Sequence, residues 1–232
     1  MKADIARQLA EKTRADYDAL ADAMDVTRHE VWREVADLVP VFRHEDTVLD
    51  IGCGNGRMVQ ALTGTIPGRR VSIRHYIGLD ASPELVKRAK NRYPQATFMV
   101  GDALALPFTD GSFDHIFMIA VLHQIPGADE RKKALAEAFR VLKPGGTMVI
   151  TVWRLWQARY LWRIVQSTVQ KLFGQHRMDF GDLLIPWKDK GVNRYYHAFC
   201  ASTMRRILAE AGFEIVKEQR GWNYGYLVRR PV

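Results

Sequence analysis

The chain has 232 residues, of which 47% are apolar and 26% are charged. This composition excludes a disordered or fibrous protein, and the length is that of one large domain or two small ones with a sizeable core. The net charge of +8 is unevenly distributed. Residues 1–139 contain 18 Lys or Arg and 20 Asp or Glu (net −2), whereas residues 140–232 contain 16 Lys or Arg and 6 Asp or Glu (net +10). This asymmetry favours a polyanionic partner over a merely solvated surface.

The first 40 residues have the apolar spacing of helices that carry many charges, and Pro40 ends this pattern. Residues 47–51 form a short apolar run that leads directly into a glycine turn, which indicates a buried strand. The next predicted elements are, in chain order, a helix over residues 58–62, a strand over 71–79 closed by Asp80, and a helix over 83–92 with proline in its first turn.

The alternation of strands and helices continues along the chain. The predicted elements are a strand over residues 97–100, a strand over 113–120, a helix over 129–142 that the run Lys-Pro-Gly-Gly at 143–146 stops, and an apolar strand over 147–152. Residues 154–197 interrupt the alternation, and a helix over 202–211 and strands over 213–218 and 224–228 follow it. This pattern predicts an α/β fold with a doubly wound, mostly parallel seven-stranded sheet and helices on both faces.

A glycine loop follows the first predicted strand. Asp50 precedes Gly52, Gly54 and Gly56. Glycines allow the backbone to approach a ligand closely, and the helix that follows offers free N–H groups. A dinucleotide fingerprint needs a third glycine where this chain has Arg57, so the loop favours an adenosine-containing cofactor other than NAD.

Other polar residues also follow predicted strands. Asp80 ends the second strand, where a carboxylate can accept hydrogen bonds from both ribose hydroxyls. Asp102 follows the third strand, where it could contact a ligand or only form a turn. Asp50 is expected to organise the loop indirectly through backbone hydrogen bonds. Cys53 is expected to be a small spacer, since no paired base lies nearby in the sequence.

The order and spacing of five elements resemble the class I S-adenosylmethionine-dependent methyltransferases. These elements are the glycine loop, Asp80, Gly-Asp at 101–102, Ser-Phe-Asp at 112–114, and residues 140–146 before the fifth strand. The resemblance implies a Rossmann-like fold and S-adenosylmethionine as cofactor. It assigns cofactor binding to Arg28, Trp32, Asp50, Gly52, Cys53, Gly54, Asn55, Gly56, Asp80, Ala81, Asp102, Ala103, Leu104 and Ala120. Residues 1–40 would form a helical cap over this site, and residues 41–232 the methyltransferase domain.

Further segments resemble the tRNA methyltransferases that esterify 5-carboxymethyluridine at the wobble position, a family that includes a domain fused to a dioxygenase in animals. They are Thr27-Arg28 with Trp32, residues 119–124, Val152-Trp153 with Gln157, residues 184–187, and Arg-Tyr-Tyr-His at 194–197, which is the most specific. Many members have two histidines where this chain has His123-Gln124, which leaves the exact substrate open. Eukaryotic relatives require a small zinc-binding activator subunit, so the resemblance raises the question of such a partner.

The implied chemistry suits these residues. A substrate carboxylate is ionised at neutral pH, so its oxygen can attack a sulfonium methyl without a general base, and catalysis becomes mainly alignment. The donors expected to hold the carboxylate are His123, Arg194, Tyr195 and His197. His123 could instead be a helix cap or core residue. One of the rings of Tyr195 and Tyr196 is expected to pack inward while the other faces the site.

Residues 154–197 are expected to form a basic, aromatic substrate-binding insertion. They hold 8 Lys or Arg against 3 Asp or Glu, and 8 of the 24 aromatic residues. Basic side chains bind phosphates and aromatic faces stack on splayed bases, which suits a nucleic acid. The resemblance at residues 194–197 implies that this partner is a tRNA anticodon loop, and no DNA, membrane or metal is expected. The alternative is an apolar lid over a small substrate. With two cysteines, no signal peptide and no long apolar stretch, a cytoplasmic protein is expected.

Three functional hypotheses follow from these observations. The first is methyl transfer to the carboxylate of 5-carboxymethyluridine in tRNA, which gives the methyl ester. The second is a small-molecule methyltransferase that acts on a quinone or natural-product precursor. The third is a non-catalytic tRNA-binding subunit that keeps the fold, against which the intact glycine loop argues.

Overall fold

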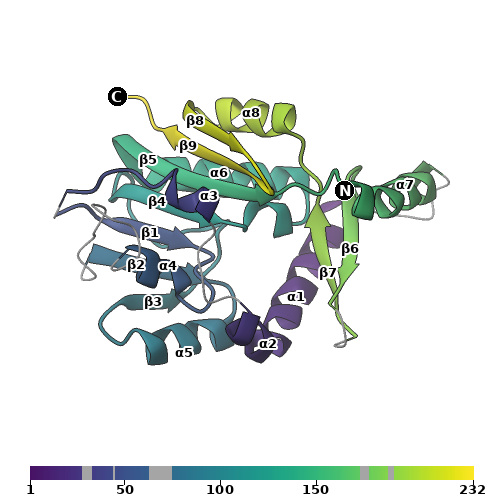
Figure 1. Ribbon diagram of the computed structural model, residues 1–232, viewed down its shortest axis with the longest axis horizontal. Helices are drawn as coiled ribbons and strands as arrows, with labels where there is room; N and C mark the ends of the chain where they lie inside the picture. The colour runs from purple at the N-terminus through teal and green to yellow at the C-terminus, as the bar shows by residue number, and fades with distance from the viewer. Residues whose placement is uncertain (28–32, 44, 63–74, 173–177, 188–190) are drawn as a thin grey trace.

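The computed structural model describes residues 1–232 except 28–32, 44, 63–74, 173–177 and 188–190. The helices are α1 (Ala3–Ala19), α2 (Ala21–Thr27), α3 (Arg33–Ala36), α4 (Arg57–Gln60), α5 (Pro83–Arg92), the 3₁₀ helix η3 (Leu122–Gln124), α6 (Ala128–Val141), α7 (Ala158–Leu172) and α8 (Ala201–Glu210) (Figure 1). The strands are β1 (Val48–Ile51), β2 (Tyr76–Asp80), β3 (Thr97–Val100), β4 (Phe113–Ile119), β5 (Leu142–Trp153), β6 (Asp182–Pro186), β7 (Asn193–His197), β8 (Glu214–Arg220) and β9 (Asn223–Arg229).

Seven strands form one sheet in the order β3-β2-β1-β4-β5-β9-β8, which confirms the predicted fold class. The strands from β3 to β5 are parallel neighbours, and β9 pairs antiparallel with both β5 and β8. The chain reverses its direction across the sheet between β1 and β4. Ligands of open α/β sheets bind outside the carboxyl ends of the strands at such a switch point.

Helices cover both faces of this sheet, as predicted. All four residues of β1 are buried, because a central parallel strand packs on both sides. On one face the core includes Leu135 of α6 and Leu208 of α8. On the other it includes Met58 of α4 and Val86 of α5.

Most predicted boundaries agree with the structure to within two residues, and three differences are larger. The single helical pattern over residues 1–40 is divided into α1, α2 and α3. Strand β2 begins at Tyr76 rather than at residue 71, and residues 71–74 lie outside the described residues. Strand β5 begins at Leu142 directly after α6, because Gly145 adopts a positive φ of 78° and donates its N–H to the carbonyl of Arg230. The Lys-Pro-Gly-Gly run therefore ends the helix but lies within an irregular strand.

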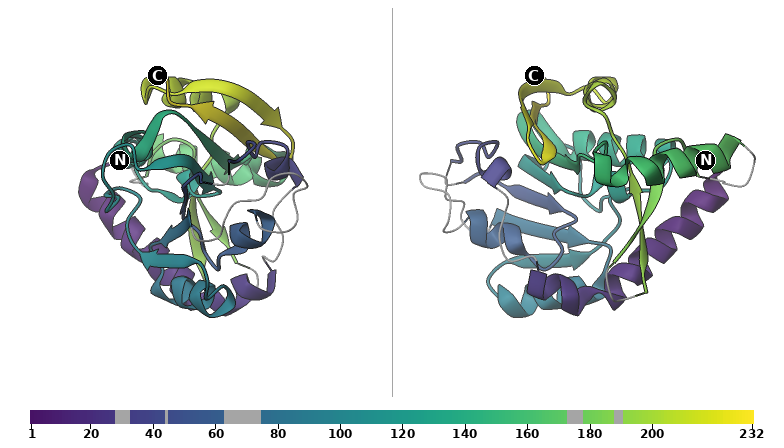
Figure 2. Two further views of the ribbon diagram at one scale, coloured as in Figure 1. Left: turned by 90° about the vertical axis from the view of Figure 1, so that its left-hand side faces the viewer. Right: turned by 45° about the vertical axis from the view of Figure 1, so that its right-hand side comes forward.

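The described residues between 154 and 197 include α7 and the antiparallel β6–β7 hairpin, which stand beside the large sheet (Figures 1 and 2). Helix α1 runs alongside β7, and Lys12 Nζ donates to the carbonyl of Asn193 at 3.3 Å. At the other end of the first two helices, Ser82 bonds Asp18, and Arg88 pairs with Asp22 at 2.6 Å. The N-terminal helices thus connect the hairpin to α5.

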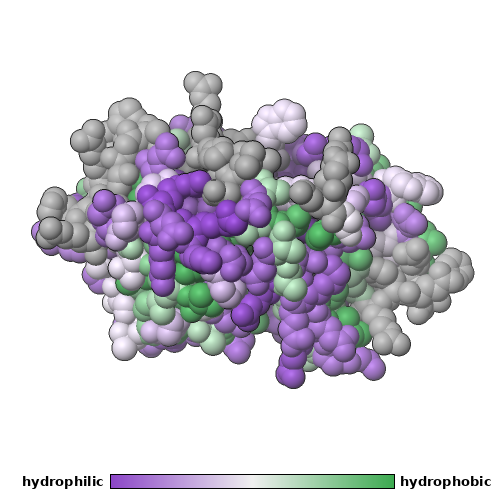
Figure 3. All heavy atoms as spheres, turned by 90° about the horizontal axis from the view of Figure 1, so that it is seen from below, coloured by the Kyte–Doolittle hydropathy of each residue, from purple (hydrophilic) through white to green (hydrophobic). Residues whose placement is uncertain are grey.

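Hydrophilic side chains dominate the face seen from below, with smaller apolar areas between them (Figure 3). In the described part of the chain, no helix combines the length and the apolar character needed to cross a membrane.

Candidate functional site

The glycine loop is fixed by its neighbours at the carboxyl end of β1. The N–H groups of Gly52 and Cys53 donate to the carbonyl of Leu79 at 2.7 and 3.1 Å. Gly52 has a φ of +72°, and an added Cβ would lie 2.2 Å from Cγ2 of Val121. Gly54 has a φ of +55°, and an added Cβ would meet no atom within 4 Å. The loop is therefore packed at its start and open at Gly54.

Asp50 is buried in β1, two residues before Gly52. It is 1% exposed, and Tyr76 donates its hydroxyl to Asp50 Oδ2 at 2.7 Å. Burial raises the pKa of Asp50 from 3.8 to about 7, although the hydrogen bond from Tyr76 opposes this shift. Cys53 is 4% exposed and its buried thiol packs beside Gly78 of β2. Burial raises the pKa of the Cys53 thiol well above its usual value, which suits a spacer and not a nucleophile.

The buried carboxyl of Asp50 makes stability depend on pH. Its pKa is about 7 in the folded chain against 3.8 when solvated, so the folded state holds the proton more tightly between these values. The stabilisation is complete below pH 4 and is lost as the pH rises through 7, by up to roughly 4 kcal/mol. We expect Asp50→Asn to flatten the decline in unfolding free energy between pH 5 and 8, measured by urea denaturation. Parallel pH profiles for the two proteins would contradict this assignment.

Asp80 lies at the carboxyl end of β2 with both oxygens oriented by backbone donors. Its Oδ2 accepts the N–H of Gly54 at 2.8 Å, and its Oδ1 accepts the N–H of Ser82 at 2.9 Å. Burial raises the pKa of Asp80, and the two N–H donors oppose this shift. Each carboxylate oxygen keeps a second lone pair, so Asp80 can still accept two ligand hydroxyls.

Asp102 has a different environment after β3. It is exposed, and its Oδ1 accepts the N–H of Leu104 at 2.8 Å. This is the turn chemistry that the sequence left open as an alternative. The turn presents the backbone of Ala103 and Leu104 to the same space as Asp80.

A cavity of about 790 Å³ lies at this edge of the sheet. Ten of the predicted cofactor residues line it: Gly52, Cys53, Gly54, Asn55, Asp80, Ala81, Asp102, Ala103, Leu104 and Ala120. Asp50 and Gly56 are not among the lining residues, and Arg28 and Trp32 lie outside the described residues. The volume suits a small-molecule ligand. The open face at Gly54 and the remaining acceptor sites of Asp80 fit the adenosine part of S-adenosylmethionine.

Sequence reasoning missed part of the cavity wall. Arg7, Arg14 and Tyr17 of α1 and Lys133 of α6 also line the cavity. Lining residues recur on α1 every three or four positions, through Ala3, Ala6, Ala10, Thr13 and Tyr17. This one-sided stripe of mostly small residues was the available signal, because small side chains leave space beside a helix.

Ala120 shapes the wall at the end of β4. Its φ is +60°, which is rare for a residue other than glycine, and its N–H donates to the carbonyl of Thr151 at 3.1 Å. This turn directs the chain into η3 and places Val121 against Gly52. Val121 and Gln124 line the cavity, whereas His123, between them, is fully buried.

Two of the predicted acceptor residues, His123 and Arg194, meet in what we call the aromatic cluster: His123, Trp153, Trp187, Arg194 and Tyr196. The Tyr196 ring stacks on Trp153 at 4.9 Å and on His123 at 5.4 Å, and His123 lies 5.5 Å from Trp153, measured between ring centroids, so each of the three rings contacts the other two. The guanidinium of Arg194 lies 4.3 Å from the ring centroid of Trp187 and 5.1 Å from that of Tyr196. Its side chain therefore contacts aromatic faces on more than one side.

The other two predicted residues lie on the opposite face of the hairpin. Arg131 of α6 donates to the hydroxyl of Tyr195 at 3.1 Å, and His197 Nδ1 lies 2.7 Å from Oδ1 of the fully buried Asp182. Burial lowers the pKa of His197, and the hydrogen bond to Asp182 opposes this shift. Tyr195 and Tyr196 are both buried, so the expectation that only one ring would pack inward is wrong.

The aromatic cluster lies one layer behind the cavity. None of His123, Arg194, Tyr195 and His197 is among the described lining residues. Two contacts connect the cluster to the wall. His123 is in η3 between Val121 and Gln124, and Trp187 packs in a core cluster with Tyr17 and Met24, which both line the cavity.

Arg194 has unused hydrogen-bonding capacity. The residue is 7% exposed, and its Nε and Nη1 atoms have no hydrogen-bond partner within the described part of the chain. Among the described residues no carboxylate pairs with this guanidinium, which makes its burial unfavourable, and an anionic ligand would supply the missing acceptors.

Comparison with known proteins adds to this geometry. Residues 49–150 match the family model of a methyltransferase domain. The chain is 36% identical over 137 residues to a tRNA (carboxymethyluridine(34)-5-O)-methyltransferase of Arabidopsis thaliana, which covers 59% of this chain and 31% of that protein. It is also 36% identical over 135 residues to a demethylmenaquinone methyltransferase of Renibacterium salmoninarum, which covers 58% of this chain and 52% of that protein. The alignments thus span about a third and about half of these relatives.

Solved structures share the whole fold. A S-adenosylmethionine-dependent methyltransferase of Methanosarcina mazei has a TM-score of 0.70 at 23% identity and covers 88% of this chain and 99% of that one. A methyltransferase of Haloferax volcanii, solved in complex with the Trm112 methyltransferase activator, has a TM-score of 0.66 at 22% identity, with coverages of 95% and 98%. The fold, the glycine loop with Asp80 and the family match over residues 49–150 together show that this chain carries a class I, S-adenosylmethionine-dependent methyltransferase domain.

Proposed function

We propose that this methyltransferase esterifies the carboxylate of 5-carboxymethyluridine at the wobble position of tRNA. The observation that carries the proposal is Arg194, a buried guanidinium that contacts aromatic rings and keeps two nitrogens without a partner in the described chain. Such a group selects a planar anion in a site from which water is largely excluded. The similarity to the plant tRNA methyltransferase supports a carboxylate on uridine as that anion.

The residues of the chain would divide the work between two places. Asp80 would accept the ribose hydroxyls of S-adenosylmethionine, and the turn at Asp102 would meet its adenine. The cofactor supplies an electrophilic methyl group on a sulfonium. Arg194 would hold the acceptor carboxylate, which must enter from the cavity side past Val121 and Gln124. Because the rings of Trp187 and Tyr196 share the cation, the carboxylate keeps enough charge to act as a nucleophile.

The proposal also includes partners and domain roles. Helix α1 would serve as the N-terminal cap over the cofactor, since its residues line the cavity. The insertion over residues 154–197 would bind the anticodon loop. A small activator subunit is a further proposed partner, supported by the Haloferax volcanii methyltransferase that was solved with its activator.

The test is a methylation assay on tRNA that carries free carboxymethyl groups. Purified chain is incubated with S-adenosylmethionine and such tRNA, with and without a candidate activator, and the wobble nucleosides are analysed by mass spectrometry. We expect the mass of the methyl ester, which mild alkali should remove. The absence of ester in both reactions would refute the proposal.

A small-molecule methyltransferase is the second candidate, supported by the similarity to the demethylmenaquinone methyltransferase. In that case the methylated product in an extract survives ribonuclease treatment, and Arg194→Ala leaves its formation largely intact. A non-catalytic tRNA-binding subunit, the third candidate, would show no heat of binding when titrated with S-adenosylmethionine.

A further inference from the structure

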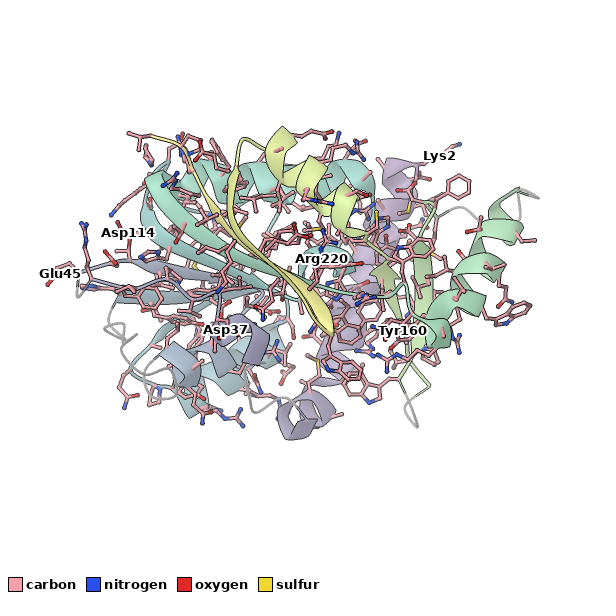
Figure 4. All side chains as sticks on the ribbon, turned by 45° about the horizontal axis from the view of Figure 1, so that its top comes forward. Lys2, Asp37, Glu45, Asp114, Tyr160 and Arg220 are labelled. Atoms are coloured by element: carbon pink, nitrogen blue, oxygen red, sulfur yellow. The ribbon has the colours of Figure 1, made fainter. Side chains whose placement is uncertain are left out.

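Helix α7 packs on the hairpin through one narrow face. Ile164 is buried in a small core with residues of both hairpin strands, and Ser167 Oγ donates to the carbonyl of Asp182 at 2.8 Å. Tyr160 packs against the same core, and Figure 4 labels it where α7 meets the rest of the chain. The remainder of the helix projects away from the large sheet (Figure 1).

The outward face of α7 carries a basic and aromatic surface. Trp162 is 73% exposed, and Arg159, Arg163 and Gln166 are also exposed. At about 100° per residue these four side chains occupy one continuous arc of the helix. We call them the α7 outer face. Leu161, Val165 and Val169 are exposed on the neighbouring arc and form an aliphatic stripe.

The charge around α7 restricts what can cover this surface. Residues 154–178 contain five Lys or Arg and no Asp or Glu. Two copies of α7 packed together would bring like charges into contact, which disfavours self-association. An anionic partner is favoured, and exposed guanidinium groups beside an exposed indole suit nucleic acid, because arginines bind phosphates and aromatic faces stack on bases.

The position of α7 points to the same partner. The helix packs on the hairpin that carries Arg194, through Ile164 and Ser167. A tRNA whose wobble base reaches Arg194 would therefore have neighbouring nucleotides within reach of α7. Unpaired loop bases can splay out and stack on protein rings, unlike bases within a helix.

We propose that the α7 outer face binds the unpaired loop of the tRNA substrate, with Trp162 stacked on a base and Arg159 and Arg163 on the flanking phosphates. This inference rests on the proposed function for the identity of the RNA. Binding of RNA by α7 can nevertheless be measured without any methylation.

The test compares Trp162 variants in equilibrium binding of end-labelled tRNA, followed by fluorescence anisotropy. Trp162→Leu keeps an apolar side chain but removes the stacking ring, and we expect it to raise the dissociation constant about 10-fold. Trp162→Phe keeps a ring and should stay within about 3-fold of the parent chain. The matched control is Val169→Ser on the aliphatic stripe, which should leave the affinity unchanged. Trp162 is exposed, so these changes spare the core.

The arginines provide a second, independent readout. Substitution of both Arg159 and Arg163 by Gln should weaken binding. It should also reduce the magnitude of the slope of log affinity against log salt by about 1.4, which is the counterion release expected for two single-strand phosphate contacts. An unchanged slope would overturn the phosphate assignment.

The outcomes separate this inference from the proposed function. If Trp162→Leu weakens tRNA binding but no ester forms with the parent chain, the α7 assignment stands and the proposed function fails. If ester forms and Trp162→Leu changes neither the dissociation constant nor the KM for tRNA, the α7 inference is overturned. If Val169→Ser lowers the tRNA affinity and Trp162→Leu does not, the RNA contacts the aliphatic stripe instead of the α7 outer face, and the inference is overturned.

Discussion

Replacement of Arg194 by Met is expected to lower kcat/KM for tRNA esterification by at least about 100-fold, while S-adenosylmethionine binding changes little. The variant removes the buried cation proposed to hold the acceptor carboxylate, and an unpaired carboxylate in that place costs the full desolvation of a charged group. Arg194→Lys should not restore the rate. The ammonium group of lysine is compact, so unlike the planar guanidinium it cannot lie flat on the rings of Trp187 and Tyr196 or present two parallel donors to the carboxylate.

Steady-state kinetics on tRNA and calorimetric titration with S-adenosylmethionine test this prediction together. The matched control is Arg206→Met, because Arg206 is an exposed arginine of α8 that pairs with Glu210 on the same helix. A thermal melt separates a rate effect from misfolding. The loss of the contacts with Trp187 and Tyr196 is offset by removal of a buried cation that has no ion pair among the described residues, so the melting temperature should change little. Normal esterification by Arg194→Met would show that the carboxylate is held elsewhere.

The parts of the fold that the sequence predicts best have local signals. Helix α5 begins at Pro83 and ends at Arg92 as predicted, since Ser82 caps it and accepts the N–H of Leu85 at 3.2 Å. Strand β3 also has its predicted bounds. Strand β2 begins at Tyr76 among the described residues, and its predicted start at residue 71 lies outside them.

The acceptor residues could not be placed in this way, because their surroundings come from distant segments. Tyr196 stacks on His123 and Trp153, which precede it by more than 40 residues. Strand alternation correctly put Tyr195 and Tyr196 on opposite faces, but it cannot show that both faces of the hairpin are covered. The core that includes α7 buries one ring, and the hydroxyl of Tyr195 lies within bonding distance of Arg131 of α6 on the other face.

The same reasoning applies to the cavity wall. The glycine loop, Asp80 and Asp102 stand next to strand ends, so their common location follows from the topology of a parallel sheet. The contribution of Arg14 and Tyr17 depends instead on how α1 docks against β7 and α5. Docking of one helix on distant elements leaves only a weak trace in the sequence, here the stripe of small residues.

The largest expected effect on the cofactor comes from Asp80. Asp80→Ala removes both proposed acceptors of the ribose hydroxyls and also releases the N–H groups of Gly54 and Ser82. Hydrogen bonds to a charged group contribute about 1.5–3 kcal/mol each, so we expect the dissociation constant for S-adenosylmethionine to rise by at least about 100-fold. Asp80→Asn keeps one acceptor oxygen and should lose less affinity than Asp80→Ala.

Calorimetric titration with S-adenosylmethionine measures this loss, and Asp110→Asn is the matched control, since Asp110 is exposed and pairs with Arg140. The pH dependence gives an independent check. Burial raises the pKa of Asp80, so its carboxylate becomes protonated earlier on acidification than a solvated aspartate does. A protonated carboxyl accepts less strongly, and cofactor affinity should therefore fall on acidification in the parent chain but stay flatter in Asp80→Asn. Equal affinities of the parent chain and Asp80→Ala for S-adenosylmethionine would contradict the assignment of Asp80 as the acceptor of the ribose hydroxyls.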